Sequence, residues 1–337
     1  MINYKENFKN SLTSSTKITP VAPITTIVLM EYMEKTGAKF PEAHTDADNM
    51  MELAAASYNY SGIEGINIPF DMTIESEAIG CKVDLRSDDQ RPEVIETPFN
   101  NPDDISIPDD FLYNGRMPVL FDAIEKIQEK YQEVPLIVGV VGPFTLLGQL
   151  LGIEELLKLV VTDYFEIEEA ISIVTDALLD FTSKIDSYSV DAICVCEPSS
   201  SSDLLNPDIF KRLVTPELEL LSDNIQSGSI LHICGDTTPI IPDMLRVGYD
   251  AISIENAVDL DYVMNKRAEL NSNTKICGNI STNKALLLGS MDDVINESVN
   301  ALEKGVDILC SSCSVPPHSP EENVHAMITA RDEYISK

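Results

Sequence analysis

Residues 229–239 read SILHICGDTTP, and this stretch decides how the rest of the chain is interpreted. A short run rich in β-branched residues leads into His232, Ile233 and Cys234, and residues 236–239 then have the composition of a helix start. Residues i and i+2 of a strand point to the same side, so His232 and Cys234 are predicted to project together where the strand ends. Imidazole and thiolate are zinc ligands, so this pair would supply half of a metal site. The alternative is a buried thiol beside a core histidine.

The same strand, loop and helix pattern recurs along the chain. Short β-branched runs alternate with helix-length segments, which is typical of parallel βα units. Eight such strands in 337 residues predict an α/β fold, a (β/α)8 TIM barrel carrying insertions. A doubly wound open sheet is the alternative, but no G-x-G-x-x-G motif follows the first strand. The predicted strands are 17–26, 65–71, 134–141, 191–196, 229–234, 250–254, 275–277 and 306–310.

Two segments depart from this rhythm. Residues 1–16 are predicted to form an N-terminal helical extension. Residues 80–108 contain the charged, proline-bearing run CKVDLRSDDQRPEVIETP and are predicted to form a hairpin inserted after strand 2. No low-complexity linker interrupts the chain, so residues 1–337 are expected to form a single barrel domain. Helices are expected over 28–36, 47–59 and 114–130.

The charge balance excludes several kinds of partner. With 56 acidic and 23 basic residues, the net charge of −33 argues against nucleic acid and anionic membranes as partners. Adaptation of the surface to salt is the favoured explanation, and an acidic face that docks a protein is the alternative. No stretch approaches 18 apolar residues and the N-terminus is polar, so no membrane insertion is expected. An odd number of cysteines, seven, fits a reducing, cytoplasmic location.

Cys310 and Cys313 follow the last predicted strand and could complete a metal site with His232 and Cys234. Four protein ligands would make a closed, structural site, whereas three would leave a position for substrate. Cys313 is favoured because it lies just past the strand, where the barrel mouth should be.

The remaining cysteines and histidines are weaker candidates for metal ligands. Cys194 and Cys196 are interpreted as core thiols, with a second metal site as the alternative. His44 is expected at the surface or behind the site, and His318 and His325 are expected to be solvated.

Several polar side chains lie at predicted strand ends. Active sites of barrels collect at the carboxyl ends of the strands, so these residues should converge on one mouth. Asp71, Glu197 and Asn279 are the predicted cofactor-binding residues, and Glu255 also lies at a strand end. Each of the three acids could instead cap a helix at its βα turn.

Motifs of one known family recur in seven segments: 31–54, 69–84, 141–148, 197–210, 232–237 (HICGDT), 278–281 and 307–320 (DILCSSCSVPPHSP). Through them the chain resembles the methylcobamide:coenzyme M methyltransferases, a branch of the uroporphyrinogen decarboxylase superfamily. The resemblance implies a (β/α)8 barrel in which His232, Cys234 and Cys313 bind catalytic zinc. Glu255 is then the candidate fourth ligand when substrate is absent. Cys310 departs from the family pattern and leaves open which thiol binds.

The resemblance implies transfer of a methyl group from a methylated corrinoid, carried on a partner protein, to the thiol of coenzyme M, as in methanogenesis from methylated compounds. It argues against decarboxylation of porphyrinogens, because residues 23–35, PITTIVLMEYMEK, lack the arginine-rich motif of those enzymes. One of the few Lys or Arg residues near a βα loop is expected to meet the sulfonate of coenzyme M. Two alternatives are a related enzyme with another acceptor, such as a folate or a different thiol, and a non-catalytic zinc-stabilised barrel that binds a corrinoid protein.

Overall fold

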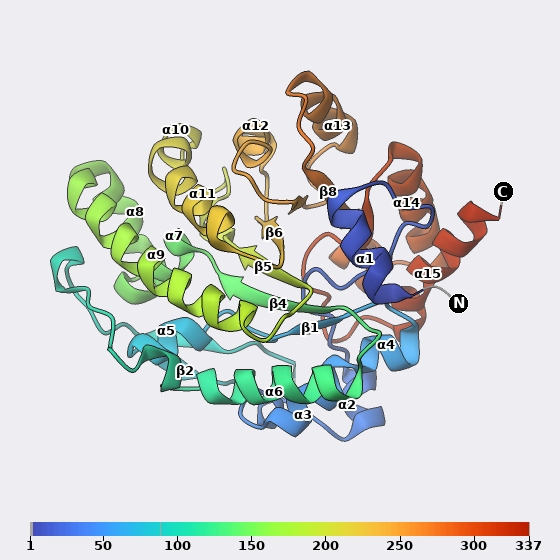
Figure 1. The fold of residues 1–337 in the computed structure, drawn as a ribbon, viewed down its shortest axis with the longest axis horizontal. Helices are drawn as coiled ribbons and strands as arrows, with labels where there is room; N and C mark the ends of the chain where they lie inside the picture. The colour runs from blue at the N-terminus through green and yellow to red at the C-terminus, as the bar shows by residue number, and fades with distance from the viewer. Residues whose placement is uncertain (1–2, 88, 337) are drawn as a thin grey trace.

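Parallel strands form a strongly curled sheet in the order β1-β4-β5-β6-β7-β8-β9, and helices cover its outer face (Figure 1). The structure is a computed structural model and describes residues 3–87 and 89–336. Each of these strands except the two at the edges pairs with the strand before it and the strand after it, which confirms the predicted succession of βα units. The strands are β1 (Ile66–Ile68), β4 (Leu136–Val141), β5 (Ala192–Cys196), β6 (Gly228–His232), β7 (Ala251–Ser253), β8 (Lys275–Ile280) and β9 (Ile308–Ser311).

The helices alternate with these strands along the chain. Amphipathic segments such as residues 117–130 and 291–304 turn their apolar side toward the sheet, with their charged side in solvent. The helices are α1 (Tyr4–Thr13), α2 (Met30–Thr36), α3 (Ala47–Ala54), α4 (Ala56–Ser61), α5 (Ile74–Ile79), α6 (Met117–Lys130), α7 (Pro143–Leu151), α8 (Ile153–Thr162), α9 (Tyr164–Asp186), α10 (Pro207–Ile209), α11 (Thr215–Asn224), α12 (Ile241–Met244), α13 (Leu260–Glu269), α14 (Met291–Lys304) and α15 (Glu321–Ile335).

Residues 20–27 occupy the eighth position of the barrel, between β9 and β1. Val21 and Ile27 form isolated parallel bridges to Leu309 and Val315, and the Val21 carbonyl accepts a hydrogen bond from the Glu64 amide at 2.8 Å. The prediction of a continuous first strand over 17–26 is wrong, because prolines at 20 and 23 supply no N–H to a ladder. The segment still closes the ring.

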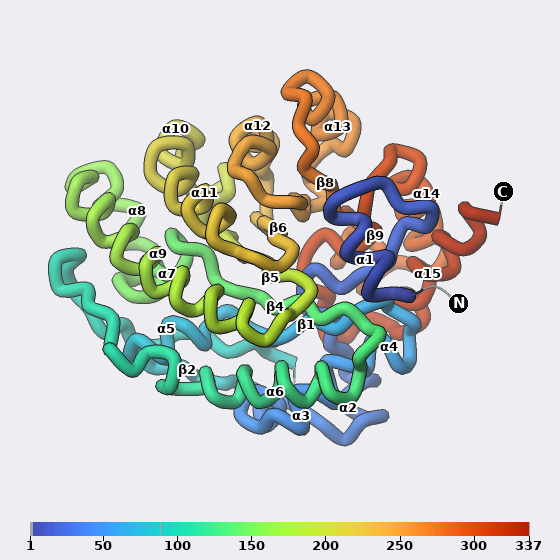
Figure 2. The backbone as a smooth tube through the Cα atoms, viewed as in Figure 1, coloured from blue at the N-terminus to red at the C-terminus, as the bar shows by residue number. Residues whose placement is uncertain are grey.

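The barrel interior is a small apolar cluster, separate from the larger one between sheet and helices. It includes Ile137, Cys194 and Cys310, and Phe8 and Leu12 of α1 are buried against it. Figure 2 shows α1 lying across the sheet, and its residues contact β8. The N-terminal helix therefore closes one end of the barrel. The carboxyl ends of the strands, at the other end, stay available for a site.

The insertion predicted over 80–108 contains a hairpin, as expected. Its strands β2 (Lys82–Asp84) and β3 (Glu93–Glu96) pair antiparallel in a sheet of their own. Short 3₁₀ turns over Pro102–Asp104 and Phe111–Tyr113 then lead into α6. The insertion is thus an appendage to the barrel, not an additional barrel strand.

Several predicted boundaries are corrected. β6 ends at His232, so Cys234 lies in the loop and not in the strand, whereas β8 runs to Ile280 and contains Asn279. The helix predicted over 47–59 is two helices, α3 and α4, which meet at Ala55. Within the part of the chain that the structure describes, no helix is both long and apolar enough to cross a membrane.

Candidate metal centre and substrate cavity

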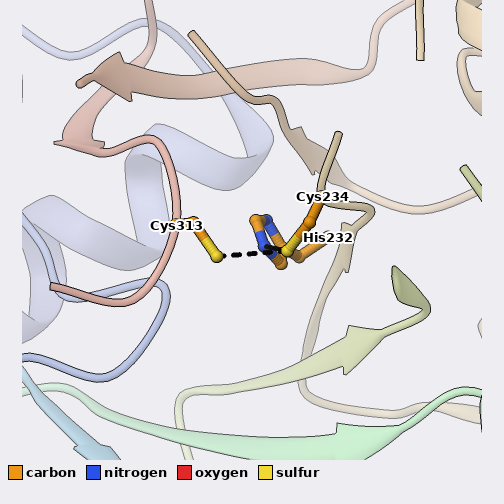
Figure 3. Close-up of side chains that lie close together, drawn as sticks. All are labelled: His232, Cys234 and Cys313. Carbon is orange, nitrogen blue, oxygen red and sulfur yellow. Dashed lines mark hydrogen bonds between the residues drawn. The ribbon is translucent and has the colours of Figure 1, made fainter. Parts of the chain in front are cut away.

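Three metal-binding side chains meet at the carboxyl end of the sheet. The donor atoms of His232, Cys234 and Cys313 all lie within 4.8 Å of one another. The Nε2 atom of His232 is 3.0 Å from the Cys234 Sγ, which is 3.1 Å from the Cys313 Sγ. In Figure 3 the three side chains point toward one another from two separate segments. One imidazole and two thiols with converging lone pairs are a donor set that zinc prefers.

A fixed loop carries Cys234 toward Cys313. Gly235 follows it with φ of 80°, and a Cβ there would lie 2.5 Å from the Asp203 Oδ2. The same carboxylate accepts a hydrogen bond from the Asp236 amide at 2.9 Å. The glycine after the cysteine is therefore required by both backbone conformation and space.

The ring of His232 is oriented from behind by Ser253 of β7. These residues are paired in the register of β6 and β7, and the His232 Nδ1 lies 3.0 Å from the Ser253 Oγ. That contact leaves Nε2 directed at the two sulfur atoms. Hydroxyl or carbonyl partners of this kind fix the orientation of histidine ligands in metal sites.

Replacing Ser253 with alanine is expected to weaken zinc affinity roughly 10- to 100-fold, because the ring loses its partner at Nδ1. Competition with a chromogenic chelator measures the affinity. Ser311→Ala is the matched control, since its buried hydroxyl on β9 has no hydrogen-bond partner among the described residues. Equal losses in the two variants would contradict this role of Ser253.

The two thiols of the centre differ in acidity. The hydrogen bond from Cys234, aided by His232, lowers the pKa of Cys313, although burial opposes that change. The same hydrogen bond and burial raise the pKa of Cys234. For His232, burial favours a lower pKa, but Cys313 outweighs it and raises the pKa. Cys313 is therefore the sulfur that gives up its proton first.

Cys310 does not reach the three-donor group. It is buried on β9 within the apolar barrel interior, where burial raises the pKa of its thiol to about 12. The carboxyl of Glu255 is not brought into the group either, within the described residues. Burial, and then the nearby Cys313, raise the pKa of Glu255. The role of Glu255 as fourth ligand stays a prediction.

The other cysteines and histidines are placed as follows. Cys194 is buried in the barrel interior, but Cys196 faces the cavity described below, with its Sγ 3.9 Å from that of Cys194. The described residues contain no second cluster of three metal-binding side chains. His44 is fully buried and contacts Asp71, so of its two expected places, at the surface or behind the site, the structure shows the second. His318 and His325 are exposed as predicted.

A cavity of about 470 Å³ opens over the three-donor group. Its walls come from the ends of several strands, from α7 and from the inserted hairpin, so residues far apart in the sequence meet there. Arg91 is the only Lys or Arg residue along its walls, counting the residues described. A small thiol entering this cavity would reach the His232, Cys234 and Cys313 side chains directly.

Asp71 lines the cavity and belongs to a buried charge network. Its Oδ2 lies 2.8 Å from the Arg116 Nη1 and 3.1 Å from the His44 Nδ1. Burial works against ionisation, but His44 and Arg116 prevail and hold the pKa of Asp71 well below its usual range. Arg116 also donates to Glu77 at 2.6 Å and to Thr73 at 2.7 Å, so its guanidinium is fully engaged.

Glu197 and Asn279 do not line the cavity. The Glu197 carboxylate is buried and accepts hydrogen bonds from the amides of Phe144 and Thr145, at 2.8 and 2.7 Å, which caps the start of α7. Asn279 donates to the carbonyls of Glu255 and Val258 at 3.2 and 3.4 Å, so it fixes the loop after β7. Their predicted cofactor contacts stay predictions.

Burial raises the pKa of Glu197 to about 7, above its ordinary value of 4.5, although its hydrogen-bond donors oppose this. A raised carboxyl pKa contributes stability that is fully present below the ordinary value and is lost as the pH rises through about 7. Gln stays neutral at this position. The free energy of unfolding of Glu197→Gln should therefore rise by roughly 3 kcal/mol relative to that of the native protein as the pH goes from 4.5 to 8.

Urea unfolding across this pH range, with exposed Glu154→Gln as control, measures the difference. Glu75 has a pKa raised by burial to about 7 as well, so part of the pH dependence should survive in Glu197→Gln. A constant difference between Glu197→Gln and the native protein at all pH values would refute the assignment.

Sequence reasoning missed Arg116 and Ser253. Arg116 precedes α6 by one residue and is 45 residues from the carboxylate that it meets. Ser253 meets His232 through strand register, which a single sequence does not specify. In the sequence, Arg116 and Ser253 stand out only as polar residues next to apolar runs. That pattern does not identify the residues that they contact.

Comparisons with known proteins place this chain in a family. The uroporphyrinogen decarboxylase (URO-D) model matches residues 5–334, and the chain belongs to that family. Within it, the chain is 34% identical over 319 residues to the methylcobamide:CoM methyltransferase MtaA of Methanosarcina barkeri, covering 94% of this chain and 93% of that protein. It is 31% identical to a methylated-thiol--coenzyme M methyltransferase of Methanosarcina mazei, over 93% of this chain and 83% of the relative.

A solved structure agrees with these relatives. A methyltransferase from Methanosarcina mazei superposes with a TM-score of 0.94 at 31% identity, covering 98% of both chains. The resemblance and the barrel fold predicted from the sequence are confirmed, as is the predicted enzyme class, a methyltransferase.

Proposed function

We propose that this protein transfers a methyl group from a methylated corrinoid, held by a partner protein, to the thiol of coenzyme M. The observation that carries the proposal is the His232, Cys234 and Cys313 group, which lines a cavity large enough for a small thiol. The relatives support it, since all are named for methyl transfer to coenzyme M.

The donor set fits zinc, with His232, Cys234 and Cys313 as its ligands and a position left for substrate. The thiolate is the nucleophile in methyl transfer, but a free thiol has a pKa of about 8.5 and is mostly protonated at neutral pH. Bound zinc would provide the thiolate at neutral pH, because coordination deprotonates a thiol. Without an arrangement of this kind, coenzyme M would attack the methyl group slowly.

The side chains of the site have separate parts in this reaction. Ser253 holds the His232 ring so that Nε2 faces the sulfur atoms. Arg116 and His44 keep Asp71 ionised at the cavity wall, where it cannot return a proton to the substrate sulfur. The apolar walls formed by Ile24, Val140 and Phe70 limit the water that reaches the nucleophile.

Incubation of zinc-loaded protein with methylcobalamin and coenzyme M tests the proposal. We expect loss of the methylcobalamin absorbance and formation of methylated coenzyme M, detected by mass spectrometry. The zinc-stripped protein should show neither. Transfer to a folate in place of coenzyme M, or no transfer by folded, zinc-loaded protein, would contradict the proposal.

A further inference from the structure

The sulfur atoms of Cys234 and Cys313 lie 3.1 Å apart, although the two residues are separated by 79 positions in the sequence. Figure 3 shows their side chains projecting toward each other from two separate segments. A disulfide bond is about 2.05 Å long, so the two sulfur atoms need to approach by only about 1 Å to form one. The arrangement that could hold a metal ion is therefore also one that oxidation can cross-link.

Small molecules in the cavity can reach this pair of thiols more easily than the others. Cys234 and Cys313 are half-buried and line the cavity. Of the remaining cysteines only Cys196 is not buried, and it lines the cavity too. Its Sγ lies 3.9 Å from that of Cys194 on the same strand, but residues i and i+2 of a strand are about 6.5 Å apart, which disfavours a disulfide between them. Cys234 and Cys313 are thus the pair that an oxidant in the cavity would join.

The disulfide of coenzyme M is an oxidant that this cavity could admit. The inference rests on the proposed function, in which the thiol of coenzyme M meets the His232, Cys234 and Cys313 side chains. A cavity of about 470 Å³ lies in the size range of sites for drug-sized molecules, so it has room for two small thiols joined by an S–S bond. Oxidised substrate would bring that bond next to the two protein sulfur atoms.

We propose that Cys234 and Cys313 form a redox switch: the disulfide of coenzyme M oxidises them to an intramolecular disulfide, and zinc is released. One thiolate of the pair attacks a sulfur atom of the bound disulfide, whose S–S bond breaks, and one coenzyme M leaves as its thiolate. The second protein thiolate attacks the protein sulfur of this mixed disulfide and expels the other coenzyme M. Two electrons pass from the protein to the small disulfide, and the zinc site loses two of its three proposed ligands.

The switch makes methyl transfer depend on the redox state of the acceptor. While coenzyme M is reduced, both protein thiolates stay available to hold zinc. When its disulfide accumulates, the two sulfur atoms are joined and transfer stops. A dithiol such as dithiothreitol reverses the cross-link by the same exchange reaction, so that zinc can bind again.

Incubation of zinc-loaded protein with the disulfide of coenzyme M, in the absence of air, tests the switch. Free thiols counted in denaturant should fall from seven to five per chain. Two equivalents of reduced coenzyme M should appear, and a chromogenic chelator should detect the released zinc. Dithiothreitol followed by added zinc should restore both the seven thiols and methyl transfer.

Tryptic peptides identify the sulfur atoms that are joined. Residues 213–246 form one peptide, in which Cys234 is the only cysteine, and residues 305–331 form another that contains Cys310 and Cys313. Cys310→Ala leaves Cys313 as the only thiol of the second peptide, and the two peptides should still be cross-linked in this variant. Cys196→Ala should give the same cross-link and the same release of zinc.

Three results would overturn the switch: no loss of thiols, a mixed disulfide that persists while zinc stays bound, or a cross-link that requires Cys196. Failure of the proposed function would look different. In that case the native protein would form the cross-link between Cys234 and Cys313, but the reduced, zinc-loaded protein would transfer no methyl group to coenzyme M.

Discussion

Cys313→Ala is expected to lower zinc affinity roughly a thousandfold, because it removes one of the three proposed protein ligands from a site whose binding free energy they would share. Methyl transfer to coenzyme M should fall with the bound zinc. Zinc content after dialysis and competition with a chelator measure the loss, and circular dichroism checks that the variant is folded.

Cys310→Ala is the matched control for this experiment. It removes a thiol three residues away that is buried in the barrel interior and lies outside the donor group. Its zinc content should equal that of the native protein. Loss of zinc in Cys310→Ala and its retention in Cys313→Ala would reverse the ligand assignment.

Arg116→Met should destabilise the fold by about 3–5 kcal/mol, because it leaves the buried carboxylate of Asp71 without its main counter-charge. Arg116 is 4% exposed and Asp71 is 8% exposed, so water cannot replace the lost contacts. The free energy of unfolding in urea measures the effect. Arg86→Met is the control, since its carboxylate partners lie on the solvent-exposed hairpin and exposed pairs contribute little, about 1 kcal/mol or less.

The destabilisation of Arg116→Met should depend on pH in a defined direction. A carboxyl whose pKa is depressed in the folded state contributes stability above its unfolded pKa, about 3.9 for Asp, and loses it as the pH falls. The difference between Arg116→Met and the native protein should therefore be largest at neutral pH and shrink in acid. A difference that is the same at pH 7 and pH 3 would show that packing, not charge, explains the loss.

The grouping of His232, Cys234 and Cys313, the proposed metal ligands, was predictable from the sequence because local rules determine it. Alternation along a strand places residues 232 and 234 on one side, and the mouth of a barrel gathers strand ends. The structure retains that proximity even though Cys234 lies in the loop after β6. Cys310 and Cys313 were separable for the same reason, since one lies within β9 and the other beyond it.

The roles of the acids at the strand ends were not predictable, because their partners are distant in sequence. Glu197 caps α7, whose first residue is 54 positions earlier, and Asp71 is held by Arg116, 45 positions later. A single sequence shows that such residues follow strands, but not which helix or cation they meet. The prediction of a strand over 17–26 was wrong for a local reason, since two prolines deprive that segment of ladder hydrogen bonds.

X-ray absorption at the zinc edge, recorded with and without coenzyme M, tests the central claim most directly. Cys234 and Cys313 should give two sulfur neighbours per zinc, and coenzyme M should raise that number to three. Two sulfur neighbours in both spectra would mean that the substrate thiol does not meet the metal, and the proposed function would be wrong.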